Sequence, residues 1–171
     1  NDILEPIKGS KWYDQLTEEL LDGAETVGEL KRSYDRAVRF VDQEIGRLIS
    51  VLESEGIAED TAIIVTADHG ESFTEHGIVF DHHGLYDVSL HVPLVIDAPE
   101  VAVGESDFIQ HFDLTPTILD LLGVNYEAQS FDGSSLVSDD QPIASRDAIF
   151  AEEAHTSRQR TIRTNQRKYI G

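Results

Sequence analysis

Acidic and histidine side chains gather in one stretch of the sequence, residues 61–93. Five of the seven histidines of the chain fall within it, and Asp68 directly precedes one of them, His69. Ahead of this pair stands Ala62–Val65, an apolar run rich in β-branched residues that predicts a buried strand of an α/β sheet. Open α/β folds bind their ligands at the carboxyl ends of strands. The order of residues therefore predicts a metal site, or a site for phosphoryl or sulfuryl chemistry, at the end of this strand.

Asp68 and His69 are the candidate metal ligands. The pair offers a hard carboxylate oxygen and an imidazole nitrogen, which together suit a divalent cation. Two ligands are too few for a closed site, so other ligands must come from elsewhere. The alternative interpretation is a capping aspartate and a structurally satisfied histidine at the end of a strand.

His82 and His83 are the candidate catalytic residues. An imidazole can act as a general acid or contact an anion near neutral pH. Against this stands the possibility that one or both of two adjacent histidines are simply exposed. Three nearby acids either accept hydrogen bonds from the histidines or are solvated loop residues, and we favour the second interpretation for them: Glu71, Glu75 and Asp81. For His91 and His111, which stand beside apolar segments, we expect structural roles.

Helices and strands alternate along the chain. Apolar residues at three- and four-residue spacing predict a long helix over 27–54, with Gly56 as its stop signal. The further expected elements are a short helix over 14–21, strands over 61–65, 92–96, 106–110 and 148–151, a helix over 113–123 that Asp113 caps, and a final strand or hairpin over 160–170. This alternation favours an α/β layer fold.

The composition narrows the range of partners. A net charge of −20, from 33 acidic and 13 basic residues, argues against nucleic acid and against an anionic membrane surface as partners. No apolar stretch reaches the roughly 18 residues of a membrane span, and the absence of cysteine excludes disulfides and thiolate metal sites. Acidic residues spread along the whole chain are typical of a halophilic surface, whose stability would rise with salt, although an ordinary acidic protein is the alternative.

Six segments, in the same order, resemble conserved segments of the sulfatase family in the alkaline phosphatase superfamily. Thr66–Glu71 is similar to the Ser/Thr-Asp-(Asn/His)-Gly metal motif of that family, and Asp113–Leu121 is similar to its "D-L-x-P-T-L-L-D-L" segment. The remaining segments are Tyr34–Leu48, Gly84–Asp87 with Val92–Ile96, Asp132–Leu136 and Thr161–Ile170. Each match alone is weak, but their shared order makes the resemblance specific.

This resemblance implies a metal-dependent hydrolase of sulfate esters that acts on a sulfated small molecule or glycan. Asp68 and His69 would be metal ligands, with calcium the expected ion and manganese or zinc as alternatives. His82 or His83 would stand where many members place a lysine that contacts the sulfate and assists the leaving group, and we favour His82. The implied fold is part of an alkaline phosphatase-like mixed sheet flanked by helices over 1–145, followed by the start of a small antiparallel β subdomain over 146–171.

The chain lacks the nucleophile motif of that family, Cys/Ser-x-Pro-x-Arg, in which formylglycine forms. None of the five prolines has Cys or Ser two positions before it. We therefore expect the chain to be a fragment that is inactive by itself, with formylglycine in an amino-terminal part. Two other interpretations stay open at this stage. One is a phosphodiesterase, phosphonate hydrolase or phosphotransferase of the same superfamily, and the other is a non-catalytic halophilic α/β module.

Overall fold

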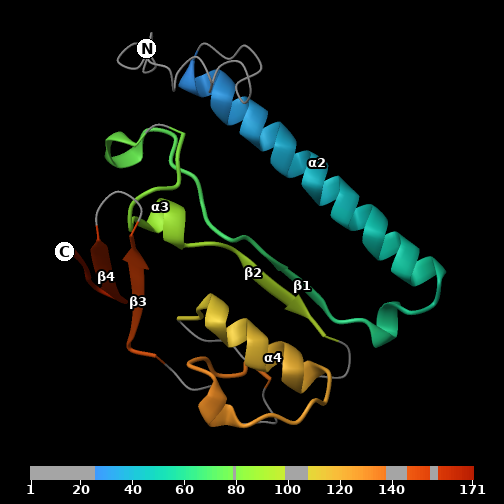
Figure 1. Ribbon diagram of the computed structural model, residues 1–171. Helices are drawn as coiled ribbons and strands as arrows, with labels where there is room; N and C mark the ends of the chain where they lie inside the picture. The colour runs from blue at the N-terminus through green and yellow to red at the C-terminus, as the bar shows by residue number, and fades with distance from the viewer. Residues whose placement is uncertain (1–25, 79, 99–107, 138–145, 155–157) are drawn as a thin grey trace.

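The computed structural model describes residues 26–78, 80–98, 108–137, 146–154 and 158–171. The long helix α2, Val27–Ser54, runs along one side of a two-stranded sheet, and the shorter helix α4, Leu114–Leu121, lies on the other side of that sheet in Figure 1. A second sheet of three strands follows at the carboxyl end. The expected helix over 14–21 lies outside the described residues.

Helix α2 confirms the long helix that the apolar spacing predicts. It begins with a capping box, in which the Glu29 backbone N–H donates to Thr26 Oγ1 at 3.2 Å and the Thr26 N–H donates to Glu29 Oε2 at 3.0 Å. It ends before Gly56, whose φ of +70° suits glycine. Only the first turn, with Val27 and Leu30, is buried.

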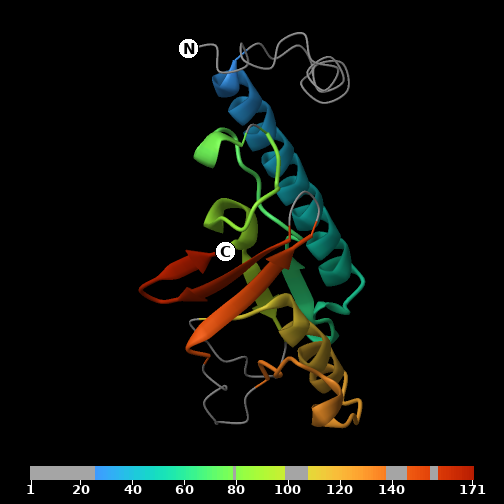
Figure 2. The same ribbon diagram turned by 60° about the vertical axis from the view of Figure 1, so that its left-hand side comes forward.

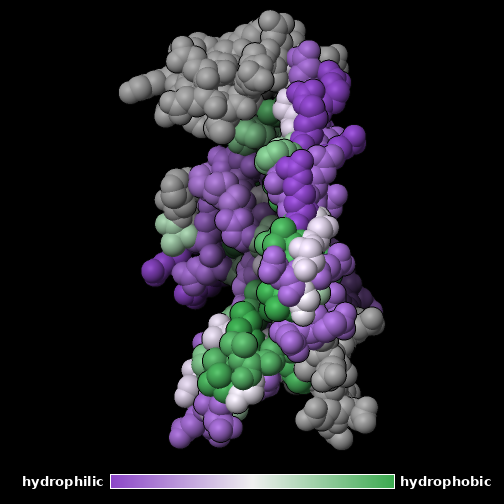
Figure 3. All heavy atoms as spheres, turned by 90° about the vertical axis from the view of Figure 1, so that its right-hand side faces the viewer, coloured by the Kyte–Doolittle hydropathy of each residue, from purple (hydrophilic) through white to green (hydrophobic). Residues whose placement is uncertain are grey.

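Apolar side chains also form a band on one face of the molecule, which Figure 3 shows in green. The large apolar residues exposed on the two longer helices include Val38, Val41 and Leu48 on α2 and Ile118 on α4, and the exposed Leu122 directly follows α4. Among the described residues, the apolar stripe of α2 therefore packs into no core beyond the first turn of the helix. Within the described residues, no helix combines the length and the apolar character needed to cross a bilayer.

Strands β1, Ile63–Thr66, and β2, Leu94–Asp97, confirm the two strands expected around the histidine-rich stretch. They pair antiparallel, with Ile64 opposite Ile96 and Val65 opposite Val95. The expected burial of the first strand is wrong, because Ile63, Ile64 and Val65 of β1 are only half-buried. The side chains of β2 alternate between half-buried and exposed positions. Alternation of this kind belongs to a sheet with one open face.

The region around α4 differs from expectation at Asp113. The short 3₁₀ helix η4, His111–Asp113, leads directly into α4, and the Asp113 side chain makes no capping bond to α4. Its carboxylate instead accepts hydrogen bonds from the backbone N–H groups of Gln110 and Ser134, both at 2.8 Å, and from both terminal nitrogens of Arg146. A buried carboxylate needs a charge partner, and Arg146 supplies one. Residues 108–110 of the expected strand over 106–110 are irregular, and the rest lies outside the described residues.

The carboxyl-terminal sheet confirms the expected antiparallel segment. Its strands are β3, Ala148–Glu153, β4, Gln159–Thr164, and β5, Lys168–Ile170, in the order β3-β4-β5. The sheet lies beside the short helix α3, Asp87–Leu90 (Figures 1 and 2). Ion pairs from Arg163 and Lys168 to Asp87 join this sheet to α3. The remaining elements are the 3₁₀ helices η2, Ala58–Asp60, η3, Glu75–Gly77, and η5, Ala128–Ser130.

Candidate active site

Asp68 and His69 lie just beyond the carboxyl end of β1, where the chain turns against α3. The turn is held by the Gly70 N–H, which donates to the Ser89 carbonyl at 2.8 Å. A Cβ atom at Gly70 would lie 2.0 Å from the Val88 carbonyl oxygen, so only glycine allows this approach. The close contact fixes the backbone directly after the candidate ligands.

The Asp68 carboxylate is open to solvent and ionised. Its side chain is 89 % exposed. The hydrogen bond from the His69 backbone N–H to Oδ1 lowers the pKa of Asp68, and the charges of the His69 and His82 rings lower it further. Oδ2 therefore belongs to a carboxylate that can bind a cation.

His69 presents its Nε2 atom toward that carboxylate. Nδ1 lies 2.8 Å from the Gly70 carbonyl oxygen, which can only accept a hydrogen, so Nδ1 must be the donor. In the neutral ring this leaves a lone pair on Nε2, which lies 3.7 Å from Asp68 Oδ2. Two atoms that bind one ion at about 2.0–2.5 Å each can lie at such a separation. The donor set fits a divalent cation held by Asp68 and His69.

The loop after η3 brings His82 onto His69. Their rings stack with centroids 4.0 Å apart and an interplanar angle of 23°. The two histidines are thirteen positions apart in sequence. The chain between them folds back on itself, and a β-bridge between Ser72 and Asp81 closes this loop. A candidate metal ligand and a candidate catalytic residue therefore lie side by side.

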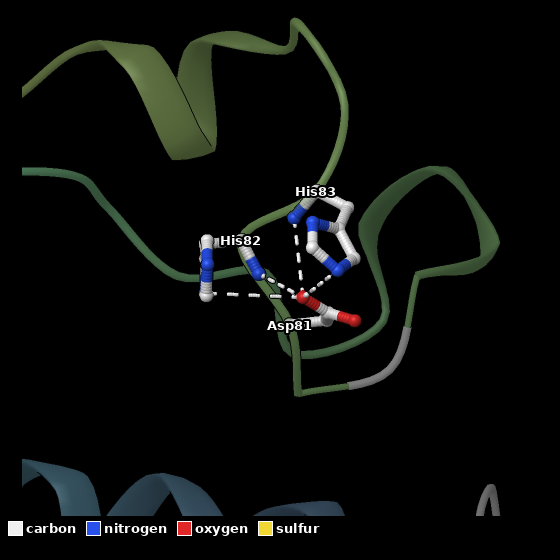
Figure 4. Close-up of side chains that lie close together, drawn as sticks. All are labelled: Asp81, His82 and His83. Atoms are coloured by element: carbon white, nitrogen blue, oxygen red, sulfur yellow. Dashed lines mark hydrogen bonds and ion pairs between the residues drawn. The ribbon is translucent and has the colours of Figure 1, made fainter. Parts of the chain in front are cut away.

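Asp81 organises the two candidate catalytic histidines. Its Oδ1 accepts the backbone N–H groups of His82 at 2.7 Å and His83 at 3.2 Å. The nearest ring nitrogens are 3.8 Å away for His82 and 3.6 Å for His83, and both rings approach this same oxygen (Figure 4). These three residues also offer ligand atoms within 4.8 Å of one another, which makes them a second candidate group for a metal. We favour Asp68 and His69 as the ligands, because the Asp68 side chain is 89 % exposed, whereas the Asp81 side chain is 27 % exposed and holds the loop through two backbone N–H groups.

The three acids that we expected to be solvated differ in their surroundings. Glu71 is half-buried, and burial raises its pKa, while His82 and His69 oppose the shift. Its Oε1 has no hydrogen-bond partner among the described residues. Glu71 is thus partly withdrawn from solvent, contrary to expectation. Glu75 instead accepts from the Phe73 and Thr74 N–H groups, and hydrogen bonds of this kind lower its pKa to about 2, so it stabilises the loop.

Glu153 is a member of the site that sequence reasoning missed. It lies at the end of β3 and is 15 % exposed at its side chain. Its Oε2 accepts the Gly84 N–H at 3.0 Å, and its Oε1 lies 3.9 Å from His83 Nδ1. The carboxyl-terminal sheet thus reaches into the loop that carries the histidines. Nothing in the local sequence distinguishes Glu153 from its exposed neighbour Glu152.

The two histidines for which we expected structural roles differ from each other. His111 contacts the end of β1, with Nε2 lying 2.9 Å from the Ala67 carbonyl oxygen, directly before Asp68. His91 is exposed at the end of α3. His76 stacks on Tyr86 with ring centroids 3.7 Å apart.

Solved structures share this arrangement of elements. The chain superposes on the phosphonate monoester hydrolase from Silicibacter pomeroyi with a TM-score of 0.75 and 28 % identity, covering 91 % of this chain and 35 % of that protein. A structure described as a complex with its substrate D-glucosamine-2-N,6-O-disulfate gives a TM-score of 0.74 and 28 % identity over 94 % of this chain and 36 % of that one. The fold is that of the alkaline phosphatase superfamily, as the sequence predicted.

The sequence comparisons narrow the class further. The family model described as Sulfatase matches residues 7–124, and the chain belongs to the sulfatase family. Choline-sulfatase from Rhizobium meliloti is 30 % identical over 152 residues, which cover 85 % of this chain. N-acetylglucosamine-6-O-sulfatase from Bacteroides thetaiotaomicron is 36 % identical over 108 residues, 61 % of this chain and 19 % of that protein. The chain spans 30 % of the length of the choline-sulfatase that it matches.

Proposed function

We propose that the protein hydrolyses sulfate esters, with a divalent cation held by Asp68 and His69. The observation that carries this proposal is the His69 geometry, in which Nδ1 donates to the Gly70 carbonyl and Nε2 faces Asp68 Oδ2 at 3.7 Å. Membership of the sulfatase family supports the same chemistry. The 171 residues contain no Cys/Ser-x-Pro-x-Arg motif, so the reaction needs a nucleophile from outside them, for which we expect formylglycine.

The cation would supply positive charge to the oxygens of the bound sulfate. We expect calcium, which favours oxygen ligands, with manganese or zinc as alternatives because of the imidazole ligand. His82, stacked on His69, is placed to contact the same anion and to protonate the leaving oxygen. His83, between Asp81 and Glu153, is the alternative for that role. The substrate would be a sulfated small molecule or glycan, the class that the names of the relatives indicate.

The experiment compares Asp68→Ala and His69→Ala with a matched control in the full-length protein. Asp97→Ala removes an exposed carboxylate at the far end of β2 and should change nothing. Metal content is measured by atomic emission, and turnover is measured with an aryl sulfate. We expect both site variants to lose bound metal and at least about 100-fold in kcat/KM. If Asp68→Ala keeps both its metal and its activity, the assignment is wrong.

A second function, hydrolysis of phosphonate monoesters, is favoured by the superposition on the Silicibacter pomeroyi enzyme. Both reactions place an anionic ester on the same cation, so the metal experiment cannot separate them. Parallel assays with an aryl sulfate and an aryl phosphonate monoester do so. We expect kcat/KM to be higher for the sulfate ester, and the reverse order would replace the sulfatase proposal with this second function.

A further inference from the structure

A cavity of about 590 Å³ lies between the first sheet and the carboxyl-terminal sheet. Its walls come from the end of β1, from α3, from η4 and from β3, β4 and β5. Thr66, two positions before Asp68, lines one side, and Asp87, four positions after His83, lines another. At roughly 3.5 Å per residue, Thr66 lies within about 7 Å of Asp68 along the chain. The cavity therefore neighbours the proposed sulfate site.

The charges that line this cavity are unusual for so acidic a chain. Among the described lining residues, Asp87 is the one carboxylate, whereas Arg163 and Lys168 are both cations. Lys168 Nζ lies 2.7 Å from Asp87 Oδ1, and Arg163 Nε lies 3.4 Å from Oδ2. One carboxylate neutralises one of the two cations. The cavity thus keeps an excess positive charge in a chain whose net charge is −20.

The surroundings of the two cations strengthen their attraction for an anion. The side chains of Lys168 and Arg163 are only 18 % and 30 % exposed. Apolar residues such as Leu94, Leu114 and Ile149 also line the cavity. Charges beside apolar walls are screened less than charges in open water. A lysine ammonium carries three N–H donors, and its bond to Asp87 uses one of them, which leaves donors for a second acceptor.

We propose that this cavity is a subsite for a second anionic group of the substrate, a carboxylate or sulfate carried on a ring. The ring would contact the apolar wall while Lys168 and Arg163 bind the oxyanion, and the ester sulfate would lie at Asp68 and His69. This subsite deepens the proposed sulfatase function and rests on it. It assigns the substrate class: sulfate esters with two negative charges rather than one.

The test uses two substrates that differ only in that second charge: 4-(carboxymethyl)phenyl sulfate and its neutral carboxamide. In the full-length protein we expect kcat/KM to be about tenfold higher for the carboxylate than for the carboxamide. We expect this difference to come from a lower KM and not from a higher kcat. Lys168→Met should reduce this preference to near one and leave the carboxamide unchanged. Arg160→Met is the matched control, because Arg160 lies on β4, pairs with Glu152 and does not line the cavity.

A binding measurement separates failure of the subsite from failure of the proposed function. Titration calorimetry with phenylacetate, and with phenylacetamide as the neutral control, needs no turnover. We expect phenylacetate alone to bind, Lys168→Met to abolish binding, and Asp87→Asn to strengthen it. Binding without hydrolysis of either ester would keep the subsite and overturn the sulfatase proposal. No binding of phenylacetate, or equal loss for both esters in Lys168→Met, would overturn the subsite.

Discussion

Replacing Asp113 with asparagine should be the most damaging single substitution among the polar residues of the described structure. The Asp113 side chain is fully buried, and four donors converge on it, two from backbone N–H groups and two from the Arg146 guanidinium. Burial alone would raise the pKa of Asp113, but the Arg146 hydrogen bonds and the two backbone N–H groups hold it below its usual range. The carboxylate is therefore ionised throughout the physiological range.

Asparagine offers one acceptor oxygen in place of two and sets an NH₂ group against the remaining donors. It also leaves the Arg146 charge without its partner, at a side chain that is only 21 % exposed. Breaking a buried pair in this way costs about 3–5 kcal/mol. For a chain of this size we expect Tm to fall by roughly 6–20 °C, because each kcal/mol corresponds to about 2–4 °C.

Thermal and urea unfolding followed by circular dichroism measure this loss. Asp147→Asn is the matched control, because Asp147 is an exposed carboxylate next to Arg146, and we expect it to change stability by less than about 0.5 kcal/mol. Arg146→Met in the Asp113→Asn background should recover part of the loss, since no unpaired buried charge then remains. A loss below about 1 kcal/mol for Asp113→Asn would refute the reasoning.

Three further predictions follow from the loop that carries the histidines. Glu75 has a folded pKa of about 2 against 4.5 unfolded, so its stabilisation is complete above pH 4.5 and is lost as the pH falls toward 2. Because this side chain is 38 % exposed, we expect about 1 kcal/mol, measured as a flatter acid-unfolding curve for Glu75→Gln. Gly70→Ala should lower the free energy of unfolding by about 1–3 kcal/mol or more and weaken metal binding. Gly46→Ala is its control, because a Cβ added at this position in α2 has no atom within 4 Å, and we expect it to be neutral or stabilising. Glu153→Gln keeps an acceptor for the loop backbone but removes the charge that faces His83, so kcat should fall about tenfold with Tm unchanged, and an unchanged kcat would count against this role.

Much of the fold could be predicted because local patterns determine it. The apolar spacing and Gly56 define α2, and the β-branched run defines β1, to within two residues. The same local reasoning failed at Asp113, because an aspartate before a helix has the appearance of a cap. Its partner Arg146 stands 33 positions away, and no local pattern shows that the two meet.

The candidate site was predictable only in part, for a similar reason. Asp68 and His69 follow directly from their place after β1. The stacking of His82 on His69, however, depends on a loop that turns at His76 and Phe80, both with positive φ, of 60° and 45°. Residues other than glycine rarely adopt this conformation, so the sequence carries no signal for it. Glu153 reaches the site through strand pairing at the other end of the chain.

The connection between β1 and β2 is closed at three nested levels, and this has a consequence for folding. Closures join Ser72 to Asp81, then Gly70 to Ser89, then Thr66 to Leu94, at separations of nine, nineteen and twenty-eight positions. Closing the widest loop directly costs about 1 kcal/mol more chain entropy than closing the narrowest. If the bridge forms first, each later closure adds only about ten positions. The smallest loop, which ends just before His82, would then order the histidine segment before the first sheet exists, so that strand pairing would complete a site already partly assembled.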